Sequence, residues 1–316
     1  MSHACSDLAM LRVIESFVLR KRAASLAQAN LGWLWTNKAN FQISKEVDKE
    51  IPWRVKPVGE LVFLLTTLNR HGLRCQTSAR LAAYALEQAS GFDWHELAAY
   101  DPSAATVLAL IGEFFALEGQ SPPFERPFFD FLERIRFFEG MDRLAYREMD
   151  FAYSLGRIGN SRYESSLATW FSSTAFGRRQ QITRYNIDDL YSLTHAVFYL
   201  TDMGLRELEQ FLDGDTTVRA RSKLVALTAM MLRADNVDVL AELMLCWLFC
   251  RIEMSNLHRR IFDQGLVRLF VSATQEGAVA PTSKIHARAK TSQASFDELY
   301  HTTLVCALLF SLLRRG

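Results

Sequence analysis

Apolar residues gather along the chain in long stretches that recur at a nearly regular distance. Six stretches are apolar almost all round, and four of them are followed directly by a glycine: Gly72, Gly119, Gly159 and Gly204. A helix that is apolar on every side is buried on every side, and glycine readily adopts the left-handed conformation that ends helices. The pattern therefore predicts six buried helices, at 57–71, 101–118, 144–158, 188–203, 237–252 and 297–313.

Amphipathic stretches with one wetter face lie between the buried ones. They predict helices at about 7–30, 78–90, 124–138, 161–176, 217–234 and 256–275. The two kinds of helix alternate with a period of about 44 residues, which is typical of helix-hairpin repeats. Two concentric rings of helices satisfy this alternation, so we predict a single all-α domain over residues 1–316, closed into an (α/α)6 toroid. An open α-solenoid built from the same hairpins is the alternative.

Two of the buried stretches begin with the same run of residue types. Asn186–Tyr191 and Ser295–Tyr300 both read polar, apolar, acid, acid, leucine, tyrosine. Asn and Ser are favoured N-cap residues, and acids in the first turn suit the partial positive charge of a helix N-terminus. Asn186 and Ser295 are therefore predicted to cap their helices.

Composition restricts the class of protein further. Of 316 residues 49% are hydrophobic, with only 7 prolines and 15 glycines, so a disordered chain is excluded. A net charge of +1 gives no general attraction for nucleic acid or an anionic membrane, and we expect neither as a partner. The N-terminus lacks a signal-peptide pattern, apolar runs such as Thr302–Leu313 are too short to span a bilayer, and five cysteines fit a reducing compartment. We expect a cytoplasmic protein.

Three long loops that precede buried helices are basic. Segments 31–56, 177–187 and 277–296 carry net charges of +2, +3 and +3, and Trp33, Trp35, Trp53 and Trp94 are predicted in loops on the same face. Long loops gathered on one face usually carry function, and helix N-termini add positive charge there. An anionic ligand is expected to bind this face; the alternative is that its cations are solvated or neutralise the acidic first turns. The predicted substrate-binding residues are Arg178, Arg179, Arg184, Lys284, Trp53 and Glu60.

Polar residues at helical spacing on the buried helices mark a face that sees water or ligand. In a toroid these stripes converge on one cavity, and the predicted catalytic residues are His195, His301, Tyr191, Tyr300, Glu242 and Asp150. Histidine beside carboxylates suits acid/base catalysis, and the two histidines with Glu60, Asp238 or Glu242 could instead hold a divalent metal. No local metal motif is present, so no cofactor is assigned. The remaining alternative is that each histidine belongs to a satisfied core network.

Asp189–Gly204, which reads DLYSLTHAVFYLTDMG, and Glu298–Ala307, which reads ELYHTTLVCA, resemble a family of uncharacterised actinobacterial proteins often found near natural-product gene clusters. At the level of fold, the plan is similar to protein prenyltransferases, squalene-type cyclases, lanthionine cyclases and many glycoside hydrolases. Their motifs do not transfer. Arg70 precedes His71-Gly72 where lanthionine cyclases have cysteine, and the run beginning at Asp188 lacks the later aspartate of terpene cyclases.

The resemblance and the predicted cavity favour a tailoring enzyme of secondary metabolism. It is expected to act on a peptide or small anionic substrate by histidine-centred, optionally metal-assisted, acid/base chemistry, with His195 as the acid/base group. The alternative is a non-catalytic helical-repeat protein that grips a peptide or a partner protein on its basic face.

Overall fold

A computed structural model describes residues 2–45, 53–101, 104–124, 134, 143–157, 159, 166–178 and 180–314, with side chains of helix α1 from Val18 onward. The predicted all-α class is confirmed. Within this part of the chain the only strands are a two-residue antiparallel pair, β1 (Ser44–Lys45) and β2 (Trp53–Arg54).

The six helices predicted to be buried are all present, with ends within a few residues of those expected. They are α2 (Lys56–Arg70), α5 (Ala105–Leu117), α7 (Ala145–Arg157), α10 (Ile187–Leu200), α12 (Val237–Phe249) and α15 (Phe296–Leu313).

The amphipathic helices are confirmed in part. Those described are α1 (Ser2–Thr36), α3 (Gln76–Ser90), α9 (Leu167–Phe171), α11 (Gly214–Met231) and α13 (Asn256–Val271). The helix predicted at 124–138 lies almost entirely outside the described residues, as does the start of that at 161–176. Two short helices fall in segments read as loops, α4 (Trp94–Tyr100) and α14 (Ser283–Ala289), together with the 3-10 turns η1 (Lys38–Phe41), η4 (Ile182–Arg184) and η5 (Leu208–Gln210).

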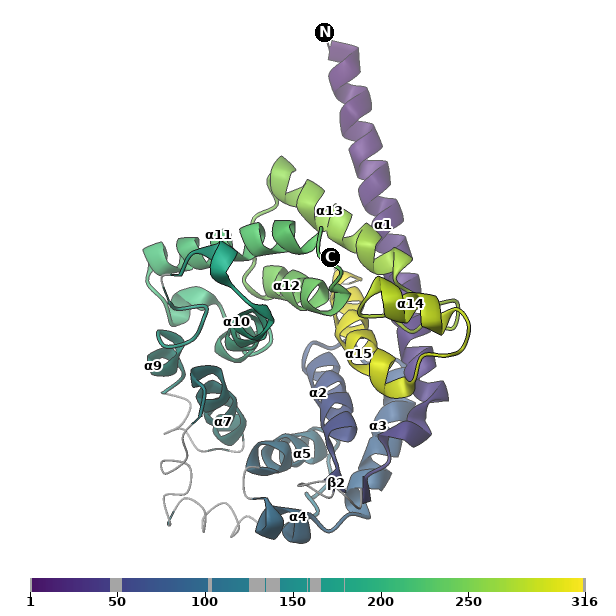
Figure 1. Cartoon of the computed structure of the whole chain (residues 1–316), viewed down its shortest axis with the longest axis vertical. Coiled ribbons are helices and arrows are strands. Elements are labelled where there is room, and N and C mark those ends of the chain that lie inside the picture. The colour runs from purple at the N-terminus through teal and green to yellow at the C-terminus, as the bar shows by residue number, and fades with distance from the viewer. Residues whose placement is uncertain are drawn as a thin grey trace.

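Figure 1 shows how the two sets of helices are arranged. Each helix of the buried set packs against the next one along the chain, and α15 packs against α2. The amphipathic helices lie outside them: α1 packs against α15, α3 and α13, while α11 packs against α12. Helices such as α2, α12 and α15 thus contact outer helices as well as their neighbours in the buried set, which is why their residues are apolar almost all round.

The helix ends follow from local chemistry. The Asn186 side chain accepts a hydrogen bond from Asp189 N (2.8 Å), and the Asp189 carboxylate accepts one from Asn186 N (3.2 Å). Ser295 N donates in the same way to Glu298 Oε2 (2.8 Å), so the shared run of residue types does begin two helices. The glycines after the buried helices have positive φ, as predicted: 66° at Gly72, 70° at Gly119, 96° at Gly159 and 84° at Gly204.

Some predicted boundaries are wrong in detail. The helix read as 188–203 ends at Leu200, because Asp202 and Met203 adopt φ values of 49° and 55°. Three tryptophans predicted to lie in loops lie in helices instead. Trp33 and Trp35 belong to the last turns of α1, and Trp94 is the first residue of α4. Trp94 is fully buried, and its Nε1 donates a hydrogen bond to Ala89 O (2.7 Å). Trp33 and Trp94 are therefore core residues, and Trp35 packs partly buried against the core.

Helix α15 is long and apolar enough to cross a membrane by length and composition, with a mean hydropathy of 1.3 over Phe296–Leu313. The apolar stretch is therefore longer than the 302–313 run expected from the sequence. Of that window 61% is buried against other parts of the protein, which is also the behaviour of a core helix, so the composition alone is weak evidence for a membrane.

Candidate functional site

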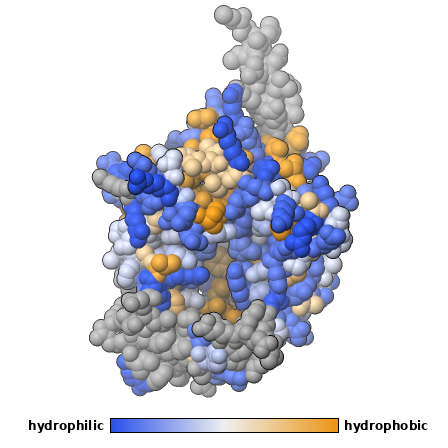
Figure 2. Space-filling model, in the orientation of Figure 1, coloured by the Kyte–Doolittle hydropathy of each residue, from blue (hydrophilic) through white to orange (hydrophobic). Residues whose placement is uncertain are grey.

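A cavity of about 1010 Å³ lies among the six buried helices, and each of them contributes to its wall. The surface is hollowed there, with apolar residues deep in the recess and mostly hydrophilic residues around it (Figure 2). Polar side chains of the wall come from the N-terminal halves of α2, α12 and α15 and from α7 and α10; they include Glu60, Glu242, His301, Asp150 and His195. Further along the helices, apolar residues such as Leu64, Leu245 and Leu308 follow. The cavity is therefore amphipathic.

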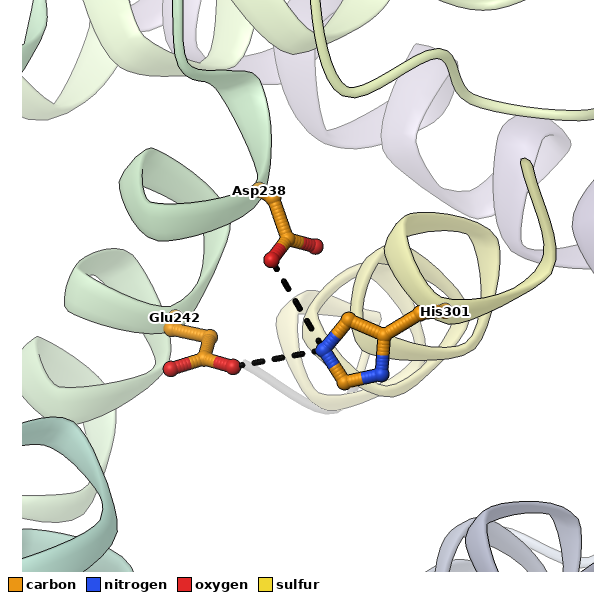
Figure 3. A group of neighbouring side chains, drawn as sticks. All are labelled: Asp238, Glu242 and His301. Atoms are coloured by element: carbon orange, nitrogen blue, oxygen red, sulfur yellow. Dashed lines mark ion pairs between the residues drawn. The ribbon is translucent and has the colours of Figure 1, made fainter. Parts of the chain in front are cut away.

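His301 lies at the centre of a cluster of three carboxylates. Its Nε2 is 3.5 Å from Glu242 Oε1 and 3.7 Å from Asp238 Oδ2, and its Nδ1 is 3.2 Å from Glu60 Oε2. Figure 3 shows that Asp238 and Glu242, one turn apart on α12, both face the imidazole of His301 on α15. One helix thus presents two acids to a histidine of the next, an arrangement that the i, i+4 spacing on α12 makes possible.

Hydroxyl groups hold the two acids of α12 in place. Tyr191 Oη donates to Asp238 Oδ2 (2.7 Å), and Thr302 Oγ1 donates to Asp238 Oδ1 (2.8 Å). Thr194 Oγ1 donates to Glu242 Oε2, which leaves Oε1 facing His301. The carboxylate orientations are therefore fixed by side chains of α10 and α15.

Charge and burial oppose each other in this cluster. Burial lowers the pKa of His301, but the carboxylates of Glu242, Glu60 and Asp238 outweigh it and raise that pKa well above its ordinary value. Burial also raises the carboxyl pKa values, and the net result is a raised pKa for Asp238 but lowered ones for Glu60 and Glu242, where the imidazole stabilises the charge. The cluster holds more carboxylates than cations.

His195 presents a second imidazole to the same cavity. Its Nδ1 lies 2.7 Å from the carbonyl oxygen of Tyr191. A carbonyl oxygen only accepts, so in the neutral ring Nδ1 carries the proton and Nε2 carries the lone pair. The rings of Tyr146, Phe198 and Tyr199 surround it, with centroids 6.0, 5.7 and 6.1 Å away. Both His301 and His195 lower the pKa of Glu242, so the ionisation of this carboxylate is coupled to both histidines.

Asp150 and Tyr300 have different surroundings. Asp150 lines the cavity, where burial raises its pKa although Arg147 and His195 oppose the rise. Tyr300 is not part of the cavity wall as described; its ring stacks on Phe296 with centroids 4.9 Å apart, and it is 6% exposed. Burial and the neighbouring Glu60 carboxylate raise its pKa. Tyr300 is therefore linked to the cavity indirectly, through its contact with the Glu60 carboxylate.

The predicted basic face is only partly available for a ligand. Arg178 lines the cavity, whereas Arg184 and Lys284 are exposed and do not contribute to its wall. Arg179 and the side chain of Trp53 lie outside the described residues. Two other cations of the basic loops are paired with acids of the first turn of α15, Arg54 with Asp297 and Arg288 with Glu298. The alternative interpretation, in which these cations neutralise acidic first turns, holds for both of them.

Thr194 and Thr302 received no role from the sequence, although they hold the two acids. A signal was present, because each threonine is the immediate neighbour of a candidate histidine, in Thr194-His195 and His301-Thr302. Neighbours in sequence point to different sides of a helix, so the histidine can face the cavity while the threonine binds the adjacent helix.

A second polar cluster ties together the C-terminal ends of four buried helices. Arg70 Nη1 donates to Asp202 Oδ1 (2.8 Å), which also accepts from Tyr153 Oη (2.9 Å), and Arg157 Nε donates to Glu113 Oε1 (3.0 Å). Glu113, Tyr153 and Arg157 line the cavity at this end. Asp202 is 6% exposed and paired with Arg70.

Residues 27–310 match the family described as Domain of unknown function (DUF6895), and the chain therefore belongs to that family. No curated protein matches the sequence. No solved structure matches the chain either.

Proposed function

We propose that this member of the DUF6895 family is an enzyme that carries out acid/base chemistry on a peptide or small anionic substrate inside an (α/α)6 toroid. Successive packing of the buried helices and the contact of α15 with α2 support a closed ring rather than an open solenoid. The observation that carries the catalytic proposal is that His195, His301 and Glu242 line one cavity of about 1010 Å³. A cavity of this size holds a drug-sized molecule or a few residues of peptide.

His195 is the acid/base group in this proposal. Because Nδ1 is engaged by the Tyr191 carbonyl, Nε2 is the atom that takes a proton from the bound substrate and later returns it. Arg178 supplies positive charge at the cavity wall for an anionic group of the substrate. Glu242 and His301 line the same cavity as His195, and Tyr191 positions both the His195 ring and Asp238.

A tailoring role in secondary metabolism, in the cytoplasm, is part of this proposal; the tailoring role rests on the resemblance carried by Asp189–Gly204 and Glu298–Ala307. A peptide-gripping protein without catalysis is the competing function. It needs a free basic face, and the pairing of Arg54 and Arg288 with acids of α15 reduces the charge that such a face offers.

Conversion of a complex substrate mixture tests the enzyme proposal. The purified wild-type chain and the His195→Gln variant are incubated with a metabolite and peptide extract of the source organism, and consumed and formed masses are compared by liquid chromatography and mass spectrometry. The control is His95→Gln, which alters an exposed histidine on α4. We expect the wild type and the control to convert the same compounds and His195→Gln to lose that conversion by about 10²-fold or more.

Circular dichroism establishes that each variant is folded. Equal conversion by folded His195→Gln and wild type overturns the role of His195. Retention of a compound at unchanged mass, with no conversion by the wild type, favours the binding protein instead.

A further inference from the structure

We infer that Asp238, Glu242 and His301 form a binding site for one divalent transition-metal ion, zinc or manganese. Each residue offers one ligand atom, and these atoms all lie within 4.8 Å of one another. Figure 3 shows the two carboxylates converging on the same imidazole nitrogen. The chemical use of the ion rests on the proposed function, because the site belongs to the same cavity, whereas its binding can be measured independently.

The two separations from His301 Nε2 are closer to those between ligands of a bound ion than to those of good hydrogen bonds. His301 Nε2 lies 3.5 Å from Glu242 Oε1 and 3.7 Å from Asp238 Oδ2. Zinc bonds of about 2.0–2.2 Å at tetrahedral angles place neighbouring ligand atoms about 3.3–3.6 Å apart. Good N–H···O hydrogen bonds are shorter, about 2.7–3.2 Å. Two of the three separations are thus close to those around a shared ion, and the third, between the two carboxylates, is no more than 4.8 Å.

The acids are held as metal-ligating carboxylates usually are. Asp238 accepts hydrogen bonds from Tyr191 and Thr302, and Glu242 accepts one from Thr194. Such outer partners fix the direction of a ligand atom and limit the cost of bringing two carboxylates together. Glu242 and Asp238 are 1% and 5% exposed, so bulk water does little to offset their mutual repulsion, and a cation between them would.

The second nitrogen of His301 provides an independent observation. Nδ1 of His301 and Oε2 of Glu60 are both buried, lie 3.2 Å apart, and have no hydrogen bond of normal geometry in the described structure. Metal-binding histidines commonly donate their other N–H to a carboxylate, which fixes the tautomer. A bound ion would displace the proton from Nε2, and with Nδ1–H directed at Glu60 the lone pair on Nε2 would then face Asp238 and Glu242. Glu60 is thus assigned as the positioning residue of His301.

The donor set indicates the class of ion. Carboxylate oxygens alone suit magnesium or calcium, whereas an added imidazole nitrogen favours zinc or another first-row transition ion. A bound ion of this kind would polarise a substrate oxygen, or lower the pKa of a bound water to about 7, in the cavity that His195 also lines.

Metal titration tests the site without a substrate. The wild-type chain is stripped with a chelator, dialysed, and titrated with Zn²⁺ against a competing chromophoric chelator, and with Mn²⁺ under electron paramagnetic resonance. We expect one equivalent bound per chain. Glu242→Gln and His301→Gln should weaken binding by more than about 100-fold, and Glu60→Gln by about 10–100-fold.

Two exposed residues supply matched controls. His95→Gln and Glu276→Gln make the same chemical changes outside the cavity and should bind the ion as the wild type does. Circular dichroism confirms that each variant is folded. No stoichiometric binding by the wild type, or equal affinity in folded Glu242→Gln, overturns the site. If the ion fails to bind while conversion of the extract still depends on His195, the metal inference fails and the proposed function stands.

Discussion

Two clusters of ionisable side chains are built on the same buried helices, and they differ in how completely their members are paired. Near the C-terminal ends, Arg70 and Asp202 meet at 2.8 Å, with the Tyr153 hydroxyl also on Asp202. Nearer the N-terminal ends, His301 faces three carboxylates at 3.2–3.7 Å, and buried atoms of His301 and Glu60 lack hydrogen bonds of normal geometry within the described part of the chain. One cluster is satisfied by the protein itself, whereas buried polar atoms of His301 and Glu60 in the other are not satisfied within the described residues.

The two clusters therefore differ in their expected roles, although they are built on the same helices. The paired cluster is expected to stabilise the fold, and the cluster around His301 is expected to serve function. Buried charges with matched partners hold helices together, and removing one partner leaves a costly unpaired charge. A buried cluster with excess carboxylate contributes less to stability than its members could, and proteins retain such local conflicts mainly at functional sites. The following changes test whether the two clusters differ in this way.

Replacement of Arg70 by methionine should have the largest effect on stability. Asp202, with its side chain 8% exposed, would lose its principal counter-charge, and breaking a buried pair costs about 3–5 kcal/mol. Urea unfolding monitored by circular dichroism measures the loss. In the matched double variant Arg70→Met/Asp202→Leu no charge is stranded at this pair, and we expect it to recover much of the stability. A loss below about 1 kcal/mol in the single variant would contradict the assignment.

The period of the sequence explains how far this cluster was predictable. Arg157 and Glu113 are 44 residues apart, and Arg70 and Asp202 are 132 apart, which is three such periods. The repeat, the helix ends at glycine and the N-cap residues could therefore be predicted from the sequence, because each follows from local residue chemistry. Which charges on neighbouring helices pair was not readable, because helical spacing alone does not show how the helices are rotated.

The candidate site was predictable to a similar depth. His195, His301, Glu242 and Asp150 do line one cavity, since polar residues on an otherwise apolar helix need a polar environment. Lys284 does not contribute to that wall, because α14 forms within the segment that was read as a loop. The salt bridges of Arg54 and Arg288 depend on where the loops fold back, which charge counting does not reveal.

Low pH should remove the stabilisation that ionised Asp202 gives to the fold. Arg70 and Arg157 outweigh the effect of burial and lower the pKa of Asp202 below its ordinary value. Its ionised form therefore stabilises the fold above the unfolded pKa of about 3.9, and this stabilisation is lost as the pH falls through the lower folded value. The free energy of unfolding of wild type and Asp202→Asn, measured from about pH 7 to about pH 3, should differ most at neutral pH. A difference that grows in acid would reverse the assigned sign.

Removing a charge from the His301 cluster should cost little stability. In Glu242→Gln the amide keeps a hydrogen bond with Thr194, and His301 retains Glu60 and Asp238 as counter-charges. We therefore expect a change of no more than about 1 kcal/mol in the free energy of unfolding, the size of one ordinary hydrogen bond. Urea unfolding in the presence of chelator measures it. A loss as large as that of Arg70→Met would mean that this cluster is structural too.

Arg288→Met should have the smallest effect on stability. Arg288 belongs to one of the basic loops, so this variant tests a charge pair outside both clusters. The pair of Arg288 and Glu298 is partly exposed, with side chains 41% and 28% accessible, and such pairs contribute about 0–1 kcal/mol. Glu298 also keeps its hydrogen bond from Ser295 N, so the start of α15 should survive. Thermal unfolding at low and high salt measures the effect. Because charge pairing at the surface is screened, any loss in Arg288→Met should shrink in high salt.

The matched control for this change is Lys290→Met, which removes an exposed cation at the C-cap of α14. It makes the same change of charge close to Arg288, so an equal loss in both variants would reflect the charge of the loop rather than the pair with Glu298. A loss that is specific to Arg288→Met but persists in high salt would contradict a screened ion pair. It would instead assign Arg288 to the folding of the segment between α14 and α15, through its second hydrogen bond to Gln293 O (2.9 Å).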